Sequence, residues 1–307
     1  MTGLLRAGWQ GGLWFPNASN TGANLTGSLT AVPGTNSGPG WAWDASTSTV
    51  NITGSDTVAG LAISGAVKIT ANGVTLTNCS VTNGITVSGS SGSPVTGCTI
   101  GNCAVTVLYN AGEVIITEYA TGMLIHDCTL SGLNTSWGRA DYAIEAAEGG
   151  DSLTVLRCDI SAFRVGFSCA QGWIQDCYIH DPGFFGPDHT DGIDCEGNAA
   201  PLTILHNTIL IPITETAPIH LNGSSAQISG VTIQDNLLAG GGYAIYGGNT
   251  GSHGSPTDMI SQGNWFSTMY FPDCGEQGPV ADWYDTGNTW SNNVWFDGPL
   301  AGQLITV

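Results

Sequence analysis

The chain has 307 residues, with 24 acidic and 5 basic side chains and a formal net charge of −19. This charge argues against nucleic acid and anionic membrane surfaces as partners, because both are bound mainly through cationic side chains. Only 9% of the residues are charged and 45 are glycine, so short strands joined by turns are favoured over long amphipathic helices.

The N-terminal part is expected to cover one end of the molecule. Residues 1–58 lack any repeat and are rich in Gly, Asn, Thr and Trp, which predicts a cap or attachment segment. Met1–Gln10 has no sustained apolar run of the kind found in secretory signals, and no stretch reaches the roughly 18 apolar residues of a transmembrane helix. We therefore expect no membrane insertion and a location in a virion tail, with a secreted protein as the alternative.

A short pattern recurs through residues 59–307: a polar residue, then Cys or Asn, then the apolar end of a strand. The repeated positions are Cys79, Cys98, Cys128, Cys158, Cys177, Asn207, Asn236, Asn264 and Asn293. Their spacing is 19 residues at two places and 28–30 residues at the others, as in a solenoid whose coils carry insertions at their turns. The sequence thus predicts an all-β fold, a single-stranded right-handed parallel β-helix of roughly nine coils.

The repeated residues are expected to stack inside the solenoid. The cysteines would form a column of small buried hydrophobic side chains, and the asparagines a ladder in which each amide bonds the next. A metal site along the cysteine column is not expected, because the close CxxC spacing of such sites is missing.

A second repeat predicts a column of outward-facing side chains on a neighbouring sheet. An apolar residue recurs in each strand, and the residue after it should point outward because strand residues alternate. The column consists of Glu145, Ser168, Asp194, His220 and Tyr246. Neighbours in it should lie about 4.8 Å apart.

The candidate catalytic groups come from residues 180–196 and from this column. A glycosidase needs two carboxyl groups, about 5 Å apart for retention and about 6.5–9.5 Å for inversion. Asp191 and Asp194 are the candidate pair, with His189 beside them and His220 one coil above to tune Asp194. Glu145 lies two coils below, at about 9.6 Å.

Other roles for these residues remain open. Asp191 could instead bond backbone N–H groups of a turn that His189 fixes. A polysaccharide lyase is less favoured, because it needs a cation beside the substrate carboxylate and basic residues are scarce. No cofactor or metal is required by the sequence. Ca²⁺ is the ion that would fit, with ligands from Asp188, Asp191, Asp194 or Glu196.

Several runs of residues together resemble a known group of proteins. They are Leu238–Gly248, Gly263–Phe266 with Tyr270–Pro272, and His189–Ile193. The chain is similar, over roughly residues 60–300, to right-handed β-helix proteins of actinobacteria and to minor tail proteins of their phages. This resemblance implies a tailspike-like protein that binds host cell-surface glycan, contacts other tail proteins, and forms a homotrimer by analogy with tailspikes.

A more distant resemblance concerns the acidic segment. Thr190–Asp194 is similar to the Asn-Thr-Asp-Gly-Ile-Asp segment of pectin-cleaving β-helix hydrolases, which place catalytic acids there. His189 stands where those enzymes have Asn, and their Gly-Asp-Asp, Gly-His-Gly and Arg-containing motifs are missing. These departures argue against galacturonan as the substrate.

Recognition of a host cell-surface glycan is the function that we expect. Flat aromatic faces suit sugar rings, and Tyr178 and Tyr246 are the candidates for stacking, with Asn222 and Glu196 as polar contacts. Further candidate aromatics are Trp173, Phe184, Phe185 and Tyr243. The alternatives are a glycan hydrolase or lyase and a purely structural tail component.

Overall fold

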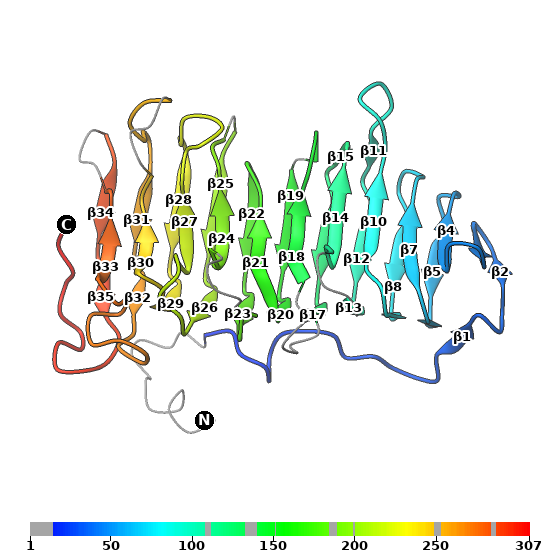
Figure 1. Cartoon of the computed structure of the whole chain (residues 1–307), viewed down its shortest axis with the longest axis horizontal. Helices are drawn as coiled ribbons and strands as arrows, with labels where there is room; N and C mark the ends of the chain where they lie inside the picture. Colours follow the sequence, from blue (N-terminus) through cyan, green and yellow to red (C-terminus); the bar gives the residue numbers. More distant parts are fainter. Residues whose placement is uncertain are drawn as a thin grey trace.

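The computed structural model describes residues 15–107, 112–132, 140–150, 152–183, 189–198, 200–248, 253–283 and 287–307. The strands of these residues form three long sheets, which together make a rod, and turns and bends connect the strands (Figure 1). Neighbouring strands pair in parallel, except where β2, β3 and β4 pair in antiparallel fashion at the N-terminal end of one sheet. The predicted parallel β-helix is confirmed. The third sheet alone has 10 strands, close to the predicted number of coils.

We number the sheets by the order in which a coil visits them after the repeated Cys or Asn. The first sheet contains β1 (Thr30–Val32), β6 (Leu61–Ile63), β9 (Ser80–Val81), β13 (Ala104–Val107), β17 (Thr129–Gly132), β20 (Asp159–Ser161), β23 (Tyr178–His180), β26 (Thr208–Ile211), β29 (Leu237–Gly240), β32 (Trp265–Phe266) and β35 (Val294–Trp295).

The second sheet carries the candidate site. It contains β2 (Ser37–Gly38), β3 (Trp41–Asp44), β4 (Thr49–Ile52), β7 (Ala66–Ile69), β10 (Ile85–Ser88), β14 (Ile115–Glu118), β18 (Ala140–Ala146), β21 (Phe163–Ser168), β24 (Asp191–Cys195), β27 (Ile219–Leu221), β30 (Tyr243–Tyr246) and β33 (Gly278–Ala281).

The third sheet closes each coil. It contains β5 (Thr57–Ala59), β8 (Thr75–Thr77), β12 (Thr99–Gly101), β16 (Leu124–His126), β19 (Leu153–Leu156), β22 (Gly172–Gln175), β25 (Leu202–Leu205), β28 (Val231–Gln234), β31 (Ile260–Gln262) and β34 (Thr289–Ser291). A small separate sheet pairs β11 (Val95–Thr96) with β15 (Ala120–Thr121). Among these described residues there is no helix long and apolar enough to cross a membrane.

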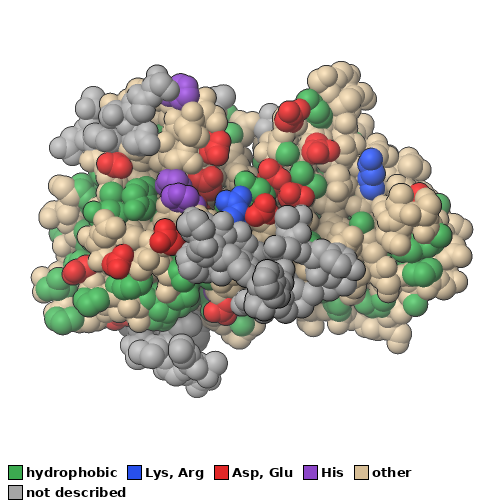
Figure 2. Space-filling view, viewed as in Figure 1, with side chains coloured by type: hydrophobic (Ala, Val, Ile, Leu, Met, Phe, Trp, Pro, Cys, Tyr) green, Lys and Arg blue, Asp and Glu red, His purple; other side chains and the backbone are tan. Residues whose placement is uncertain are grey.

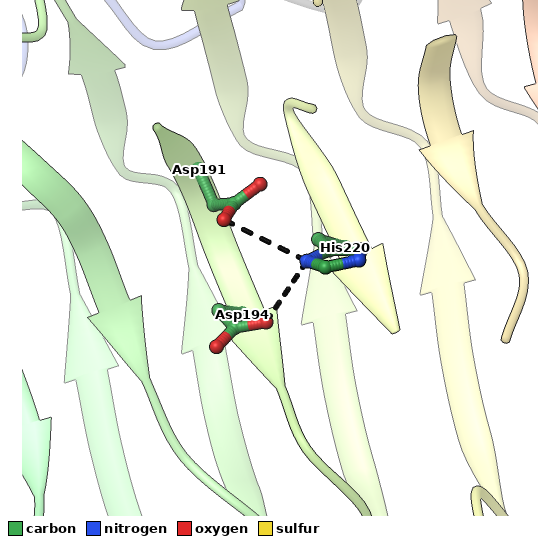
Figure 3. Close-up of side chains that lie close together, drawn as sticks. All are labelled: Asp191, Asp194 and His220. Carbon is green, nitrogen blue, oxygen red and sulfur yellow. Dashed lines mark ion pairs between the residues drawn. The ribbon is translucent and has the colours of Figure 1, made fainter. Parts of the chain in front are cut away.

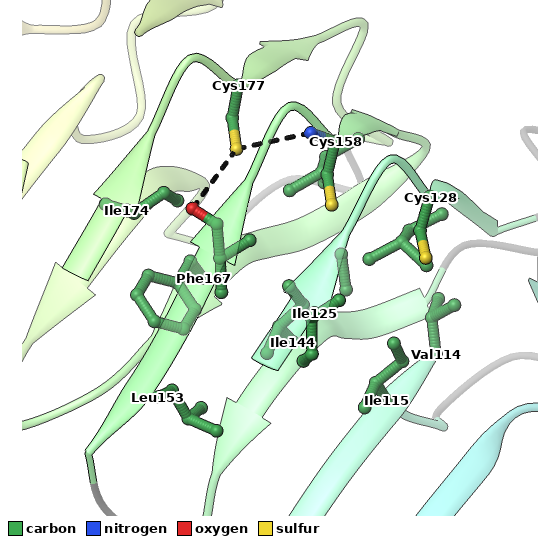
Figure 4. Packing of buried hydrophobic residues seen from close by; sticks show 14 of the residues in the cluster. Val114, Ile115, Ile125, Cys128, Ile144, Leu153, Cys158, Phe167, Ile174 and Cys177 are labelled. Carbon is green, nitrogen blue, oxygen red and sulfur yellow. Dashed lines mark hydrogen bonds between the residues drawn. The ribbon is translucent and has the colours of Figure 1, made fainter. Parts of the chain in front are cut away.

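The core fills the inside of the coils. Strands alternate buried and exposed residues, as in β19, where Leu153 and Val155 are fully buried and their neighbours are not. Ile125 and Phe167 from other strands pack into the same space (Figure 4). This alternation places one apolar face of every strand inside the rod, so burial of apolar area is the main stabilising term.

The cysteine column differs from the prediction at one position. Ala104 pairs with Ser80 below and Thr129 above, so Cys103 stands in line with Cys79 and Cys128. Cys98 precedes β12 and lies at a corner of the third sheet instead. At both places the Cys is followed two residues later by an apolar strand residue, Ile100 or Val105. The separation of 49 positions between Cys79 and Cys128 divides into 24 and 25 instead of 19 and 30.

The asparagine ladder is confirmed. Oδ1 of Asn236 accepts hydrogen bonds from the backbone N–H and the Nδ2 of Asn207, at 2.8 and 3.0 Å. Asn264 and Asn293 repeat this arrangement one and two coils further on. All four amides are fully buried, so the ladder satisfies corner backbone groups that would otherwise lose their hydrogen bonds to water.

The cysteines are predicted to be unreactive in the folded protein, and thiol labelling can test this. All nine are free and buried, and burial raises the pKa of the Cys169 thiol. Thiolate is the reactive form, so we expect the native protein to resist an aromatic disulfide reagent and to release nine equivalents of thiol only after denaturation. Rapid labelling of the native protein would contradict this packing.

Residues 15–29, which precede β1, run along the outside of the rod (Figure 1). Backbone groups of Thr26 pair with both side-chain atoms of Asn78 at 2.8 Å, and Asn24 pairs in the same way with Asn102. Sheet pairing also crosses the boundary predicted at residue 58, because β4 pairs in parallel with β7. A division into a 1–58 cap and a 59–307 solenoid stays a prediction.

Candidate functional site on the second sheet

The outward column predicted from the sequence is present on the second sheet. Glu145 pairs with Ser168, Ser168 with Asp194, Asp194 with His220, and His220 with Tyr246. Each pair joins neighbouring coils, so the five side chains follow one line along the rod. This register brings the acid Asp194, the imidazole of His220 and the phenol of Tyr246 together although up to 52 residues separate them in the chain.

Asp191, Asp194 and His220 form a close cluster within this column (Figure 3). Nδ1 of His220 lies 3.2 Å from Oδ1 of Asp194 and 3.6 Å from Oδ2 of Asp191. The aspartates lie on β24 and the histidine on β27, the next strand of the sheet. The sequence predicted His220 beside Asp194, and the structure adds Asp191 to the same nitrogen atom.

Asp191 shares this face because the strand is irregular at Gly192. Regular alternation would place residues three apart on opposite faces. In β24 a Cβ atom on Gly192 would meet the carbonyl oxygen of Pro218 at 2.6 Å, and one on Gly166 would meet the carbonyl oxygen of Gly192 at 2.5 Å. Two stacked glycines thus let the backbones approach closely, and Asp191 contacts His220 as Asp194 does.

The cluster has strongly perturbed ionisation. Burial raises the pKa of Asp191, and only part of this shift is offset by its contact with His220. Burial lowers the pKa of His220, but its contacts with Asp191 and Asp194 outweigh that effect and raise the pKa to about 10. The imidazole is therefore cationic at neutral pH, held between two carboxyl groups.

Asn222 and Tyr246 complete the surroundings of the cluster. Asn222 donates a hydrogen bond from Nδ2 to Oδ1 of Asp194 at 3.0 Å. The Tyr246 ring meets the His220 ring edge to face at 5.5 Å, and Tyr243 packs against Tyr246 in the same way at 5.3 Å. Both tyrosines are half-buried, so their rings form a partly exposed aromatic patch beside the charged groups.

Glu145 lies in the column but not in the cluster. Burial raises the pKa of its carboxyl group, and the neighbouring acids Glu113 and Asp141 raise it further. Arg164 bonds Asp141 at 2.9 Å and stacks on Tyr142. Acidic side chains gather over the middle coils on the face shown in Figure 2. Glu145 lies two coils away from Asp194 in the column.

The other candidate residues are dispersed. His189 is exposed and its Nδ1 lies 3.2 Å from Oγ1 of Thr216. Glu196 is exposed and accepts a hydrogen bond from Ser225. Tyr178 lies on the first sheet, where its ring stacks on His180 at 3.9 Å. Trp173 is exposed on the third sheet, while Asp188, Phe184 and Phe185 lie outside the described residues.

A hollow that the sequence did not indicate lies at the C-terminal end of the first sheet. It has a volume of about 550 Å³ and is lined by Thr268, Tyr270, Phe271, Pro272, Asp273, Trp295, Pro299 and Leu300. Asp297 ties its two walls together by accepting hydrogen bonds from Ser267 and Thr268. Its aromatic residues come from the two last coils, and no periodic signal marks them.

Comparison with known proteins gives the class of the fold. A family model described as "Right handed beta helix region" matches residues 43–210, more than half of the chain. The protein therefore belongs to the right-handed β-helix family, and the predicted handedness is confirmed.

One solved structure among those that are similar is described as the Dettilon tailspike protein (gp208). It is 13% identical and has a TM-score of 0.31. The match covers 76% of this chain and spans 60% of the tailspike chain. No curated protein matches the sequence. The actinobacterial lineage and the likeness to pectin-cleaving enzymes stay predictions.

Proposed function

We propose that the protein recognises a cell-surface polysaccharide through the outer face of its second sheet, at Asp194, His220, Asn222 and Tyr246. The observation that carries this proposal is the column itself, in which planar polar side chains lie next to an aromatic ring. Oδ2 of Asp194 and Nε2 of His220 have no hydrogen-bond partner among the described residues. They are therefore available to sugar hydroxyl groups.

The chemistry of the face suits an extended glycan. Sugar rings present hydroxyl groups at their edges and C–H groups on their faces, so they combine hydrogen bonds with contacts to aromatic rings. Repeated positions about 4.8 Å apart offer successive contacts to a chain molecule along the rod. The net charge of −19 disfavours polyanions and leaves neutral polysaccharides as the favoured ligands.

Binding fits the geometry better than hydrolysis. A glycosidase acid must reach the glycosidic oxygen, whereas Asp191 is only 3% exposed. Both carboxyl groups of the candidate pair also contact the same nitrogen atom of His220. They therefore share one counter-ion. A virion tail is the location that we propose, with other tail proteins and further copies of this chain as partners, following the resemblance to phage minor tail proteins.

Loss of the Tyr246 ring is expected to weaken glycan binding. Tyr246→Ala should reduce affinity for a bound polysaccharide roughly tenfold, because a ring contact contributes on the order of 1–2 kcal/mol. The measurement is binding to an array of neutral bacterial polysaccharides. Tyr178→Ala is the matched control, since it removes a half-buried tyrosine from the first sheet.

Three outcomes would decide the proposal. Loss of binding in Tyr246→Ala but not in Tyr178→Ala supports recognition by the second sheet. Equal loss in both variants, or no binding by the wild type to any glycan, would remove that face from consideration. Release of reducing sugar by the wild type that stops in Asp191→Ala and Asp194→Ala would establish a hydrolase instead.

A further inference from the structure

The ion-pair geometry of His220 differs from that of another histidine in the same protein. His180 also lies between two aspartates, but its Nδ1 contacts Asp181 at 2.8 Å and its Nε2 contacts Asp159 at 2.9 Å. A protonated imidazole has one N–H on each nitrogen, so each aspartate at His180 receives its own hydrogen bond. This is ordinary ion pairing, and it leaves no demand for another cation.

At His220 the two aspartates converge on a single nitrogen. Nδ1 faces Oδ1 of Asp194 at 3.2 Å and Oδ2 of Asp191 at 3.6 Å, and its one proton can serve only one of them well. Nε2 points away from both carboxyl groups (Figure 3). Three potential ligand atoms therefore lie within 4.8 Å of one another with one proton among them.

Asp191 is nearly buried, so its carboxyl group depends on its contacts within the cluster. The residue is 3% exposed, and its Oδ1 accepts a hydrogen bond from the backbone N–H of Ala217 at 3.1 Å. Its Oδ2 makes no hydrogen bond within the described part of the chain and is directed at the centre of the cluster (Figure 3). A carboxylate in a nearly buried residue is stabilised by a cation beside it. A metal ion at this point would contact both carboxyl groups, whereas the single N–H of His220 Nδ1 can serve only one of them well.

The donor set defines the class of cation. One imidazole nitrogen with two carboxylate oxygens suits Zn²⁺ or a similar first-row divalent ion, because imidazole favours these metals and carboxylates accept them. Ca²⁺ needs six to eight oxygen ligands, and of its predicted ligands Glu196 is bonded to Ser225 instead. Three protein ligands would leave at least one coordination position for water or for a ligand.

We propose that Asp191, Asp194 and His220 form a binding site for a divalent transition-metal ion of the Zn²⁺ type. Nδ1 of His220, Oδ2 of Asp191 and Oδ1 of Asp194 are its ligands. The site is built across two adjacent coils, so a bound ion links β24 to β27. This inference goes beyond glycan recognition and does not depend on it.

The test is titration of tag-free, chelator-treated protein with Zn²⁺ in a calorimeter, without any glycan. The wild type should bind one equivalent at this site. His220→Gln and Asp191→Asn should each weaken it more than about 100-fold, since loss of a mere hydrogen-bond partner of a metal ligand already costs roughly 10–100-fold. The matched control His180→Gln removes a histidine from an equivalent pair of aspartates and should leave the affinity unchanged.

Several results would overturn the proposal. They are no Zn²⁺ binding by the wild type, binding that survives in both site variants, or binding that is lost in His180→Gln. Should the buried Asp191→Asn variant fail to fold, His220→Gln decides, because the His220 side chain is 19% exposed. Co²⁺ provides a second readout, since visible absorption bands should appear in the wild type and vanish in His220→Gln. Glycan binding is measured in a separate experiment with Tyr246→Ala. Failure of the metal-site proposal can therefore be told apart from failure of the glycan-binding proposal.

Discussion

Replacing Asn236 with leucine is expected to destabilise the protein by roughly 3–6 kcal/mol. The Asn236 side chain is fully buried, and its Oδ1 accepts from two nitrogen atoms of Asn207. Its Nδ2 donates to the carbonyl oxygen of Ile204 at 2.9 Å. Leucine leaves the backbone N–H of Asn207 buried without a partner and removes one donor from the Ile204 carbonyl, and each lost bond of a buried group costs about 1–3 kcal/mol.

Urea denaturation followed by circular dichroism measures this effect. The control is Cys158→Ala, which changes a fully buried residue in the same column but removes only a weak S–H donor, whose acceptor, the Leu156 carbonyl, is 3.5 Å away. Its loss should be about 1–2 kcal/mol, the cost of a small cavity. Equal losses in the two variants would mean that the amides contribute no more than packing.

The second large effect is expected at Gly240, at the end of β29. Its φ is +96°, and a Cβ atom there would overlap the carbonyl oxygen of Ile211 on the preceding coil. That oxygen belongs to a paired strand and cannot move without disturbing the stack. Gly240→Ala should therefore cost at least about 3 kcal/mol, more than the strain of a positive φ alone.

Gly97→Ala separates the two contributions. Gly97 also has a positive φ, +65°, but no atom lies within 4 Å of where its Cβ would be. This variant should lose only about 1–2 kcal/mol. Thermal unfolding of both proteins provides the comparison, and a Gly240→Ala variant as stable as Gly97→Ala would show that the coils at β26 and β29 separate easily.

Much of the fold could be predicted because stacking repeats leave a periodic trace. A side chain that bonds its own counterpart on the next coil must recur at every coil, as Asn207 and Asn236 do. The same periodicity predicted the column through Asp194 and His220, which the pairing of β24 with β27 confirms. Spacing alone could not choose between Cys98 and Cys103, because insertions at turns vary and an apolar residue follows each of them two positions later.

The composition of the site was within reach of the sequence, but its geometry was not. Strand alternation, the rule that aligned Asp194 with His220, would turn Asp191 to the other face. The backbones of Gly166 and Gly192 approach closely, and the alternation is broken there. As a result, the carboxyl groups of Asp191 and Asp194 both lie next to Nδ1 of His220. Likewise, Tyr178 and Tyr246 are equally plausible sugar contacts in the sequence, yet they lie on different sheets.

The sequence by itself therefore determined which residues repeat, and with them the solenoid, its buried ladders and its outward column, because those depend on interactions between equivalent positions. Only the tertiary structure decided which non-equivalent side chains meet. Contacts such as that of Asp191 with His220 depend on a local backbone irregularity, which leaves no period in the sequence.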